Sequence, residues 1–124
     1  MNALSASALV ALGGAIGALM RFWLAVGVVG WLGAHLPFAT FITNVTGSFI
    51  IGAASVLIGG NPPVVAFLIT GVLGGFTTFS TFSLETVRLL EAGRVVDGMG
   101  YAGLSVVACV IGAALGMLAA RAVA

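Results

Sequence analysis

Charged residues are scarce in this 124-residue chain. It has four arginines, three acidic residues and no lysine, so charged residues make up 6% of the sequence, against about 25% in soluble domains. The formal net charge is +1 and there is no basic run, which excludes the usual electrostatic signature of a nucleic-acid-binding protein. The single cysteine, Cys109, excludes an intrachain disulfide and a cysteine-based metal cluster. No nucleotide-binding motif and no nucleophile–base pair is visible, so we do not expect an enzyme.

Apolar residues dominate instead. They make up 61% of the chain, and the mean hydropathy is +1.30. Residues 22–84 form a run of 63 positions without Asp, Glu, Lys or Arg, whereas one membrane-spanning helix needs about 20 apolar residues. We therefore predict an all-α membrane protein with four transmembrane helices in one domain, residues 1–124. The expected spans are about 3–32, 37–58, 64–90 and 99–120, and we expect a multi-pass protein of a plasma membrane, in contact with lipid.

Three turns separate these spans. Pro37 is suited to the first turn of the second helix, because its missing N–H would have no partner there. A Gly-Gly-Asn-Pro-Pro run at 59–63 and the charged segment 91–98 mark the other two turns. The N-terminal stretch lacks the basic start of a signal peptide, so we expect it to be a span. Arginines lie on both sides of the predicted membrane. The charge distribution therefore does not decide whether the chain inserts in one orientation or in both.

Small residues recur at the spacing of close helix contacts. Such pairs let helix backbones approach each other in lipid, where hydrophobic burial does not drive association. Four predicted spans are too few to enclose a pathway alone, so we also expect an oligomer. The pairs are Gly13/Gly17, Gly71/Gly75, Gly112/Gly116 and Ser48/Gly52.

The third span contains a polar centre. Two glycines precede Thr77-Thr78-Phe79-Ser80-Thr81-Phe82, and this composition predicts a helix broken near the middle of the membrane. One interpretation is a simple kink with Ser and Thr bonded to backbone carbonyls. The other is an ion site, since broken backbone at that depth is tolerated where it is buried in protein or lines a watery cavity. Free carbonyls would bind a small hard cation, and free N–H groups an anion.

Two polar stripes run along the second and fourth spans. An amide in hydrocarbon needs a partner, so Asn44 indicates either an interhelical hydrogen bond or a polar pathway. The stripe on the fourth span is weaker evidence by itself. It could face the stripe on the second span across a narrow groove. Each stripe has its members at i, i+4 and i+8, namely Thr40, Asn44 and Ser48, and Tyr101, Ser105 and Cys109.

Charges inside spans suggest function by default. Arg21 has no partner in its own span, and either pairs with Glu85 or lies in a watery vestibule that attracts anions. Arg88 follows Glu85 by three residues, so a local ion pair between them is a further alternative. We expect His35, in the first turn, to be solvated.

At these positions the chain resembles the Fluc-type (CrcB-like) fluoride channels. The matching segments are 13–22, 40–49, 71–85 and 101–105, one in each span, and they include the Thr-Thr-Phe-Ser-Thr-Phe motif. The resemblance covers essentially the whole chain. It implies an antiparallel, dual-topology homodimer in a bacterial cell membrane, with two pores through which fluoride leaves the cytoplasm passively.

The resemblance also assigns residues. Phe79 and Phe82 would line the pores by their positively polarised ring edges, and Asn44 would donate a hydrogen bond to fluoride. Carbonyls of Gly74 and Thr77, doubled by the two-fold axis, would hold a structural sodium ion at the dimer interface. The resemblance places Ser80 and Thr81 on the polar break, Tyr101 and Ser105 on a polar track, and Arg21 and Glu85 in the vestibules.

Cys109 departs from the family, whose members commonly carry a hydroxyl residue there, and a thiol is a poorer hydrogen-bond donor. Three alternatives stay open. A small-multidrug-type, proton-coupled transporter would need a carboxylate deep in the first span, and none is present. Proton-coupled fluoride export would need Glu85 to titrate. A purely structural subunit would not need the polar stripes.

Overall fold

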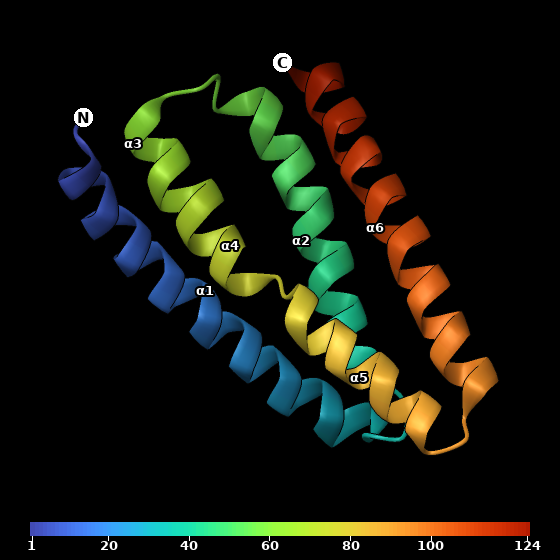
Figure 1. The fold of residues 1–124 in the computed structure, drawn as a ribbon. Coiled ribbons are helices and arrows are strands. Elements are labelled where there is room, and N and C mark those ends of the chain that lie inside the picture. The colour runs from blue at the N-terminus through green and yellow to red at the C-terminus, as the bar shows by residue number, and fades with distance from the viewer.

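The computed structural model describes residues 1–124 and is entirely helical. Four helical segments are long and apolar enough to cross a membrane, which confirms the predicted class. The chain alternates in direction, so both termini and the turn after α2 lie at one end, and the other two turns lie at the opposite end (Figure 1). The spans are α1 (Ala3–Leu32), α2 (Phe38–Leu57), a composite third span (Pro62–Glu91) and α6 (Val95–Val123).

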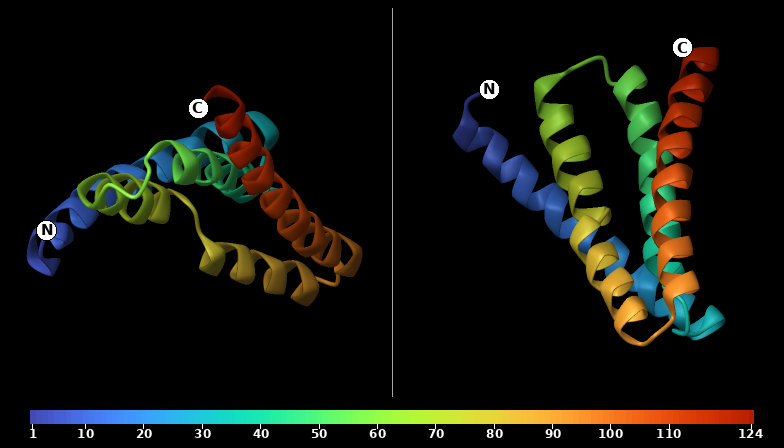
Figure 2. Two further views of the ribbon diagram at one scale, coloured as in Figure 1. Left: turned by 90° about the horizontal axis from the view of Figure 1, so that it is seen from above. Right: turned by 45° about the vertical axis from the view of Figure 1, so that its right-hand side comes forward.

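The third span consists of four pieces. Asn61 caps α3 (Pro62–Val64) by accepting a bond from the Val64 amide, and α3 leads into the π-helix η1 (Val65–Leu73) and then α4 (Gly74–Phe76). The backbone is extended at Thr77 (φ −83°, ψ 157°) and Thr78 (φ −151°, ψ 120°). Helix α5 (Phe79–Glu91) then resumes. Figure 2 shows the chain bending aside between α4 and α5.

Two helix starts differ from prediction. The third span begins at Pro62 rather than residue 64, because proline suits a helix start and Asn61 supplies the cap. The fourth begins at Val95 rather than residue 99. Asp97 therefore lies in the first turn of α6, where a carboxylate complements the helix dipole.

Helix packing relies on small residues. Helix α2 packs along α6, and α1 packs along η1 and α4. A Cβ at Gly17 would overlap the Val72 carbonyl, and one at Gly116 would overlap the Phe49 carbonyl. These glycines are therefore required for close backbone approach, as their spacing predicts.

Most of the chain's surface is apolar. Only 19 of 124 residues are buried, and large side chains such as Trp31 and Leu104 are 83% and 65% exposed. In water such exposure would favour aggregation. Lipid around the four spans, and any further copy of the chain, would cover these side chains.

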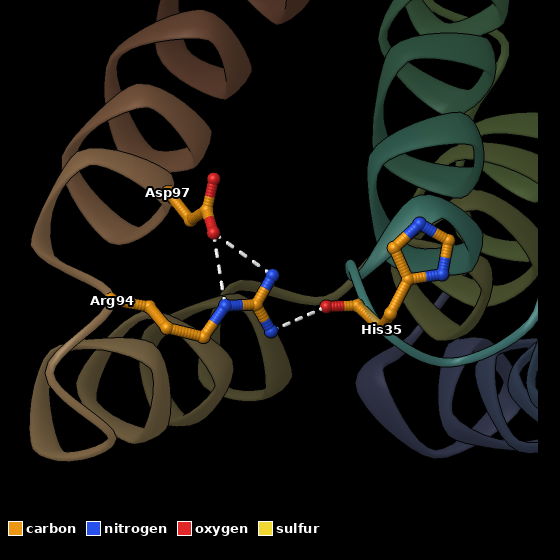
Figure 3. A network of polar contacts seen from close by, with 3 residues as sticks. All are labelled: His35, Arg94 and Asp97. Carbon is orange, nitrogen blue, oxygen red and sulfur yellow. Dashed lines mark hydrogen bonds and ion pairs between the residues drawn. The ribbon is translucent and has the colours of Figure 1, made fainter.

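One polar network joins the two turns at the end opposite the termini (Figure 3). Arg94 forms an ion pair with Asp97 at 2.9 Å. It also donates through Nη1 to the His35 backbone carbonyl at 2.6 Å. The network thus ties the start of α6 to the turn between α1 and α2. The His35 ring itself is exposed and packs edge-on against Phe38.

Candidate functional site

A cleft of about 340 Å³ lies where the interruption of the third span meets α2 and α6. It brings the two polar stripes together, because residues of both lie on its walls. Thr40 and Tyr101 are not part of this lining; both are buried. The lining comprises Asn44, Gly47, Ser48, Ile51, Leu73, Thr77, Thr78, Phe79, Phe82, Ser105, Val106 and Cys109.

Asn44 holds the extended backbone in place. Its Nδ2 donates to the Thr78 carbonyl at 2.9 Å, and its Oδ1 accepts from the Thr78 amide at 2.8 Å. Both backbone groups of Thr78 are therefore satisfied by one side chain from α2. One of the two Nδ2 hydrogens is used in this way, which leaves the amide a second donor.

The interruption diverts two donors from their usual helical partners. In a continuous helix the amide of Thr78 would bond to the Gly74 carbonyl, and that of Thr81 to the Thr77 carbonyl. Here the Thr78 amide donates to Asn44, and the Thr81 amide donates to Thr78 Oγ1 at 3.2 Å. The carbonyls of Gly74 and Thr77 therefore lose the donors that a helix would supply. These are the two carbonyls that the resemblance assigns to sodium, and carbonyl oxygens suit a hard cation.

Three aromatic rings follow one another beside the cleft. The centroids of Phe79 and Phe82 are 5.4 Å apart, and those of Phe82 and Tyr101 are 5.2 Å apart with an interplanar angle of 56°. Phe82 is 9% exposed, whereas Phe79 is 76% exposed. Tilted rings present edges as well as faces. The Tyr101 hydroxyl donates to Glu85 at 3.0 Å, which fixes the ring beside Phe82.

Ser105 carries an unsatisfied hydroxyl. The residue is 6% exposed, and its Oγ is buried without a hydrogen-bond partner. Such groups are rare in folded proteins because leaving them unpaired costs about 1–3 kcal/mol. Cys109, one turn further along α6, is partly buried and lines the same cleft. This wall of the cleft therefore has a donor available for a ligand.

Ser80 and Thr81 lie beside the break but not on the cleft lining. Ser80 is exposed, and its Oγ lies 3.4 Å from Thr78 Oγ1. Thr81 Oγ1 accepts from Thr78 Oγ1 at 3.1 Å. Both residues therefore extend the cap that starts α5.

Arg21 and Glu85 do not pair within the chain, which contradicts the alternative that they form an intrachain ion pair. Arg21 Nε donates to the Gly75 carbonyl at 3.4 Å, while Glu85 accepts from Tyr101. The ion pair between Glu85 and Arg88 is absent too, since the chain's one ion pair joins Arg94 and Asp97. The reason is geometric, because Glu85 turns toward α6 and its tyrosine. Glu85 lines a separate cavity of about 360 Å³ near the turns, together with His35, Arg88 and Arg94.

The cleft itself holds no arginine, histidine or carboxylate. Its polar groups are an amide, hydroxyls, a thiol and backbone atoms. A small ion in it would meet dipoles rather than a fixed opposite charge, which permits binding without a trap.

Sequence reasoning missed the capping role of Thr78. Its side chain accepts from the Thr81 amide and begins α5. A threonine directly before a helical segment is an N-cap signal, so this feature could have been predicted. The other missed lining residues, Gly47, Ile51, Leu73 and Val106, carry no distinguishing signal in the sequence.

Known proteins resemble this chain over most of its length. A relative from Rhizobium meliloti, named fluoride-specific ion channel FluC, is 44% identical over 86% of this chain and 92% of its own length. A relative of the same name from Ruegeria sp. is 48% identical over 92% of this chain and 93% of its own length. A third, from Methylococcus capsulatus, is 44% identical over 90% of this chain, which spans about half (51%) of that relative. The family described as CrcB-like protein, Camphor Resistance (CrcB), matches residues 8–117. The chain therefore belongs to the CrcB-like family.

Proposed function

We propose that this protein is a passive, fluoride-selective ion channel of a bacterial cell membrane that lowers cytoplasmic fluoride. The relatives that it resembles are named fluoride-specific ion channels. The observation that carries the proposal is an uncharged cleft with an unpartnered buried hydroxyl at an interruption of the third span. Four apolar helices suit a multi-pass membrane protein.

The cleft offers the donors that a small, strongly hydrated anion needs. Asn44 retains one N–H beyond its bond to Thr78. Ser105 has a free hydroxyl, and Phe82 adds polarised ring edges. In this proposal these groups replace the water around fluoride as it passes, with Phe79, Tyr101, Ser80 and Thr81 beside them. Arg21 and Glu85 belong to the vestibules.

The functional unit in this proposal is an antiparallel homodimer with two pores. One chain leaves the ring of Phe79 76% exposed next to its cleft. A second copy in the opposite orientation would cover this ring and complete the wall of each cleft. Four arginines spread over the chain set no strong orientation, which suits insertion in both directions.

The interruption at Thr77 and Thr78 then lies near the middle of the membrane, where two copies meet. The Gly74 and Thr77 carbonyls, released from their helical donors, are suited to a structural sodium ion. Gly74 is exposed on its own chain, so its carbonyl is near a surface that a partner can reach. Bound sodium would supply positive charge that holds four carbonyls together across the two-fold axis.

Two carriers are the alternatives. A small-multidrug-type transporter is disfavoured because α1 contains no carboxylate. Proton-coupled fluoride transport is disfavoured because Glu85 lies outside the cleft and is bonded to Tyr101.

Efflux from liposomes tests the proposal. Purified protein is reconstituted with internal potassium fluoride, and a fluoride electrode records efflux with and without valinomycin. We expect rapid efflux that needs valinomycin to carry compensating potassium, and no equivalent loss of chloride. Efflux that instead requires a proton gradient would establish a carrier, and no fluoride efflux from folded protein would refute the proposal.

A further inference from the structure

We propose that Cys109 is a thiol-modification site inside the cleft, through which small anionic thiosulfonate reagents stop ion flow. This inference rests on the proposed channel function, since it requires that ions pass through the cleft. The chain contains no other cysteine, so one reaction would report on one position.

The placement of Cys109 supports reagent access. It is partly buried and lines the cleft of about 340 Å³. That volume lies within the range of small-molecule pockets, about 300–1,000 Å³. Gly47 and Ser48 of α2 contribute to the same lining, and Gly47 lets the Thr77 side chain pack closely against α2.

Ser105 is the independent sign that this wall meets a ligand. It lies one helical turn before Cys109, is 6% exposed, and its buried Oγ has no partner within the chain. An unpaired buried hydroxyl is stable when water or an ion supplies the missing bond. The reaction proceeds through the thiolate form of the cysteine.

The chemistry is a thiol–disulfide type of exchange. The Cys109 thiolate attacks the sulfenyl sulfur of 2-sulfonatoethyl methanethiosulfonate. A new S–S bond forms, the S–SO₂ bond breaks, and methanesulfinate leaves with the electron pair. The thiol proton goes to water. No further oxidant is needed, because the reagent itself is reduced.

The product places a sulfonate beside Ser105 and Phe82. In a cleft without arginine or histidine, nothing neutralises this charge. It would repel an anion at close range and also narrow the passage. The thiol at this position would thus make ion flow sensitive to thiol reagents.

Labelling and flux are measured on the same reconstituted protein. We expect the intact mass to show one adduct per chain, and fluoride efflux to fall by at least about tenfold relative to untreated protein. Dithiothreitol should remove the adduct and restore fluoride efflux to that of untreated protein. An unmodified thiol in the folded protein, or complete modification with unchanged efflux, would overturn the inference.

Two variants serve as controls, each compared with its own untreated sample. Cys109→Ser should show neither adduct nor inhibition. Cys109→Ser with Ala124→Cys carries a thiol at the exposed C-terminus, and should be modified without loss of efflux; inhibition there would overturn the assignment to the cleft. If untreated wild type shows no efflux, the proposed function fails, and the adduct mass still decides whether Cys109 is reachable.

Discussion

Asn44 connects two spans through both ends of its amide. Its bonds to the Thr78 carbonyl and amide are 2.9 and 2.8 Å long, and they satisfy backbone groups that the interrupted helix leaves without partners. One side chain therefore stabilises the extended backbone and supplies a spare N–H to the cleft. Structure and proposed ion binding depend on the same residue.

We predict that Asn44→Asp impairs fluoride movement. The carboxylate would keep the bond from the Thr78 amide but would face the Thr78 carbonyl with an acceptor, and it would add negative charge to the cleft. We expect destabilisation by about 1–3 kcal/mol and loss of most liposomal efflux. The measurements are thermal unfolding in detergent and fluoride efflux.

Asn61→Asp is the matched control. Asn61 also accepts a backbone bond, from Val64 at 3.4 Å, but it is an exposed helix cap in the turn between α2 and α3 and does not line the cleft. Aspartate caps helices as well as asparagine does. Its efflux should equal that of wild type, and an equal loss in both variants would contradict the role given to Asn44.

Phe82→Ile tests the aromatic row. The substitution removes ring contacts with Phe79 and Tyr101 at 5.4 and 5.2 Å while keeping an apolar side chain. We expect a stable protein, with a cost of about 0.5–1.5 kcal/mol per lost aromatic pair, and strongly reduced fluoride efflux. The control is Phe22→Ile, on the exposed face of α1, which should leave efflux unchanged. Wild-type efflux from Phe82→Ile would show that the Phe82 ring contributes only to packing.

At the scale of elements, the four spans and the polar centre of the third follow from hydropathy and composition. A run of apolar residues of this length has few alternatives to spanning helices. The π-helix of η1 could not be predicted, because Val65–Leu73 is apolar except for Thr70 and Gly71 and carries no signal that separates a π-helix from an α-helix. At the start of α6, Arg94 bonds to the His35 carbonyl, which lies far away in sequence, so this contact could not be predicted from local composition.

Side-chain partners were the least predictable part of the site. The sequence indicates either an interhelical hydrogen bond or a polar pathway for Asn44, and the choice of Thr78 as its partner depends on where the helix interruption places that backbone. The sequence leaves two arginine partners open for Glu85, namely Arg21 in another span and Arg88 three residues further on. Its bond to Tyr101 arises from the packing of α5 against α6.

Small residues at the α2–α6 interface give an element-scale prediction. A methyl group at Gly116 would overlap the Phe49 carbonyl, whereas one at Gly103 would meet nothing within 4 Å. Gly116→Ala should therefore destabilise the protein by about 1–3 kcal/mol through overpacking. Gly103→Ala should be neutral or stabilising, since alanine favours helix. Unfolding in detergent measures the stability of each variant. Equal stabilities of Gly116→Ala and Gly103→Ala would contradict the role given to close packing at Gly116.

For the whole molecule, the dimer proposal predicts two orientations. In the Cys109→Ser background, Ala124→Cys places one thiol at the C-terminus. Labelling of intact cells with a membrane-impermeant thiol reagent should modify about half of the copies, because the arginines set no strong bias. Labelling of all copies or of none would contradict dual topology.

The central claim is that fluoride moves passively through this protein. Current through planar bilayers containing the purified protein, under a fluoride gradient and with a separately imposed pH gradient, tests it most directly. A channel predicts a reversal potential that shifts by about 59 mV per tenfold change in fluoride and does not respond to the pH gradient. A reversal potential that follows the proton gradient, or the absence of fluoride current, would contradict the account.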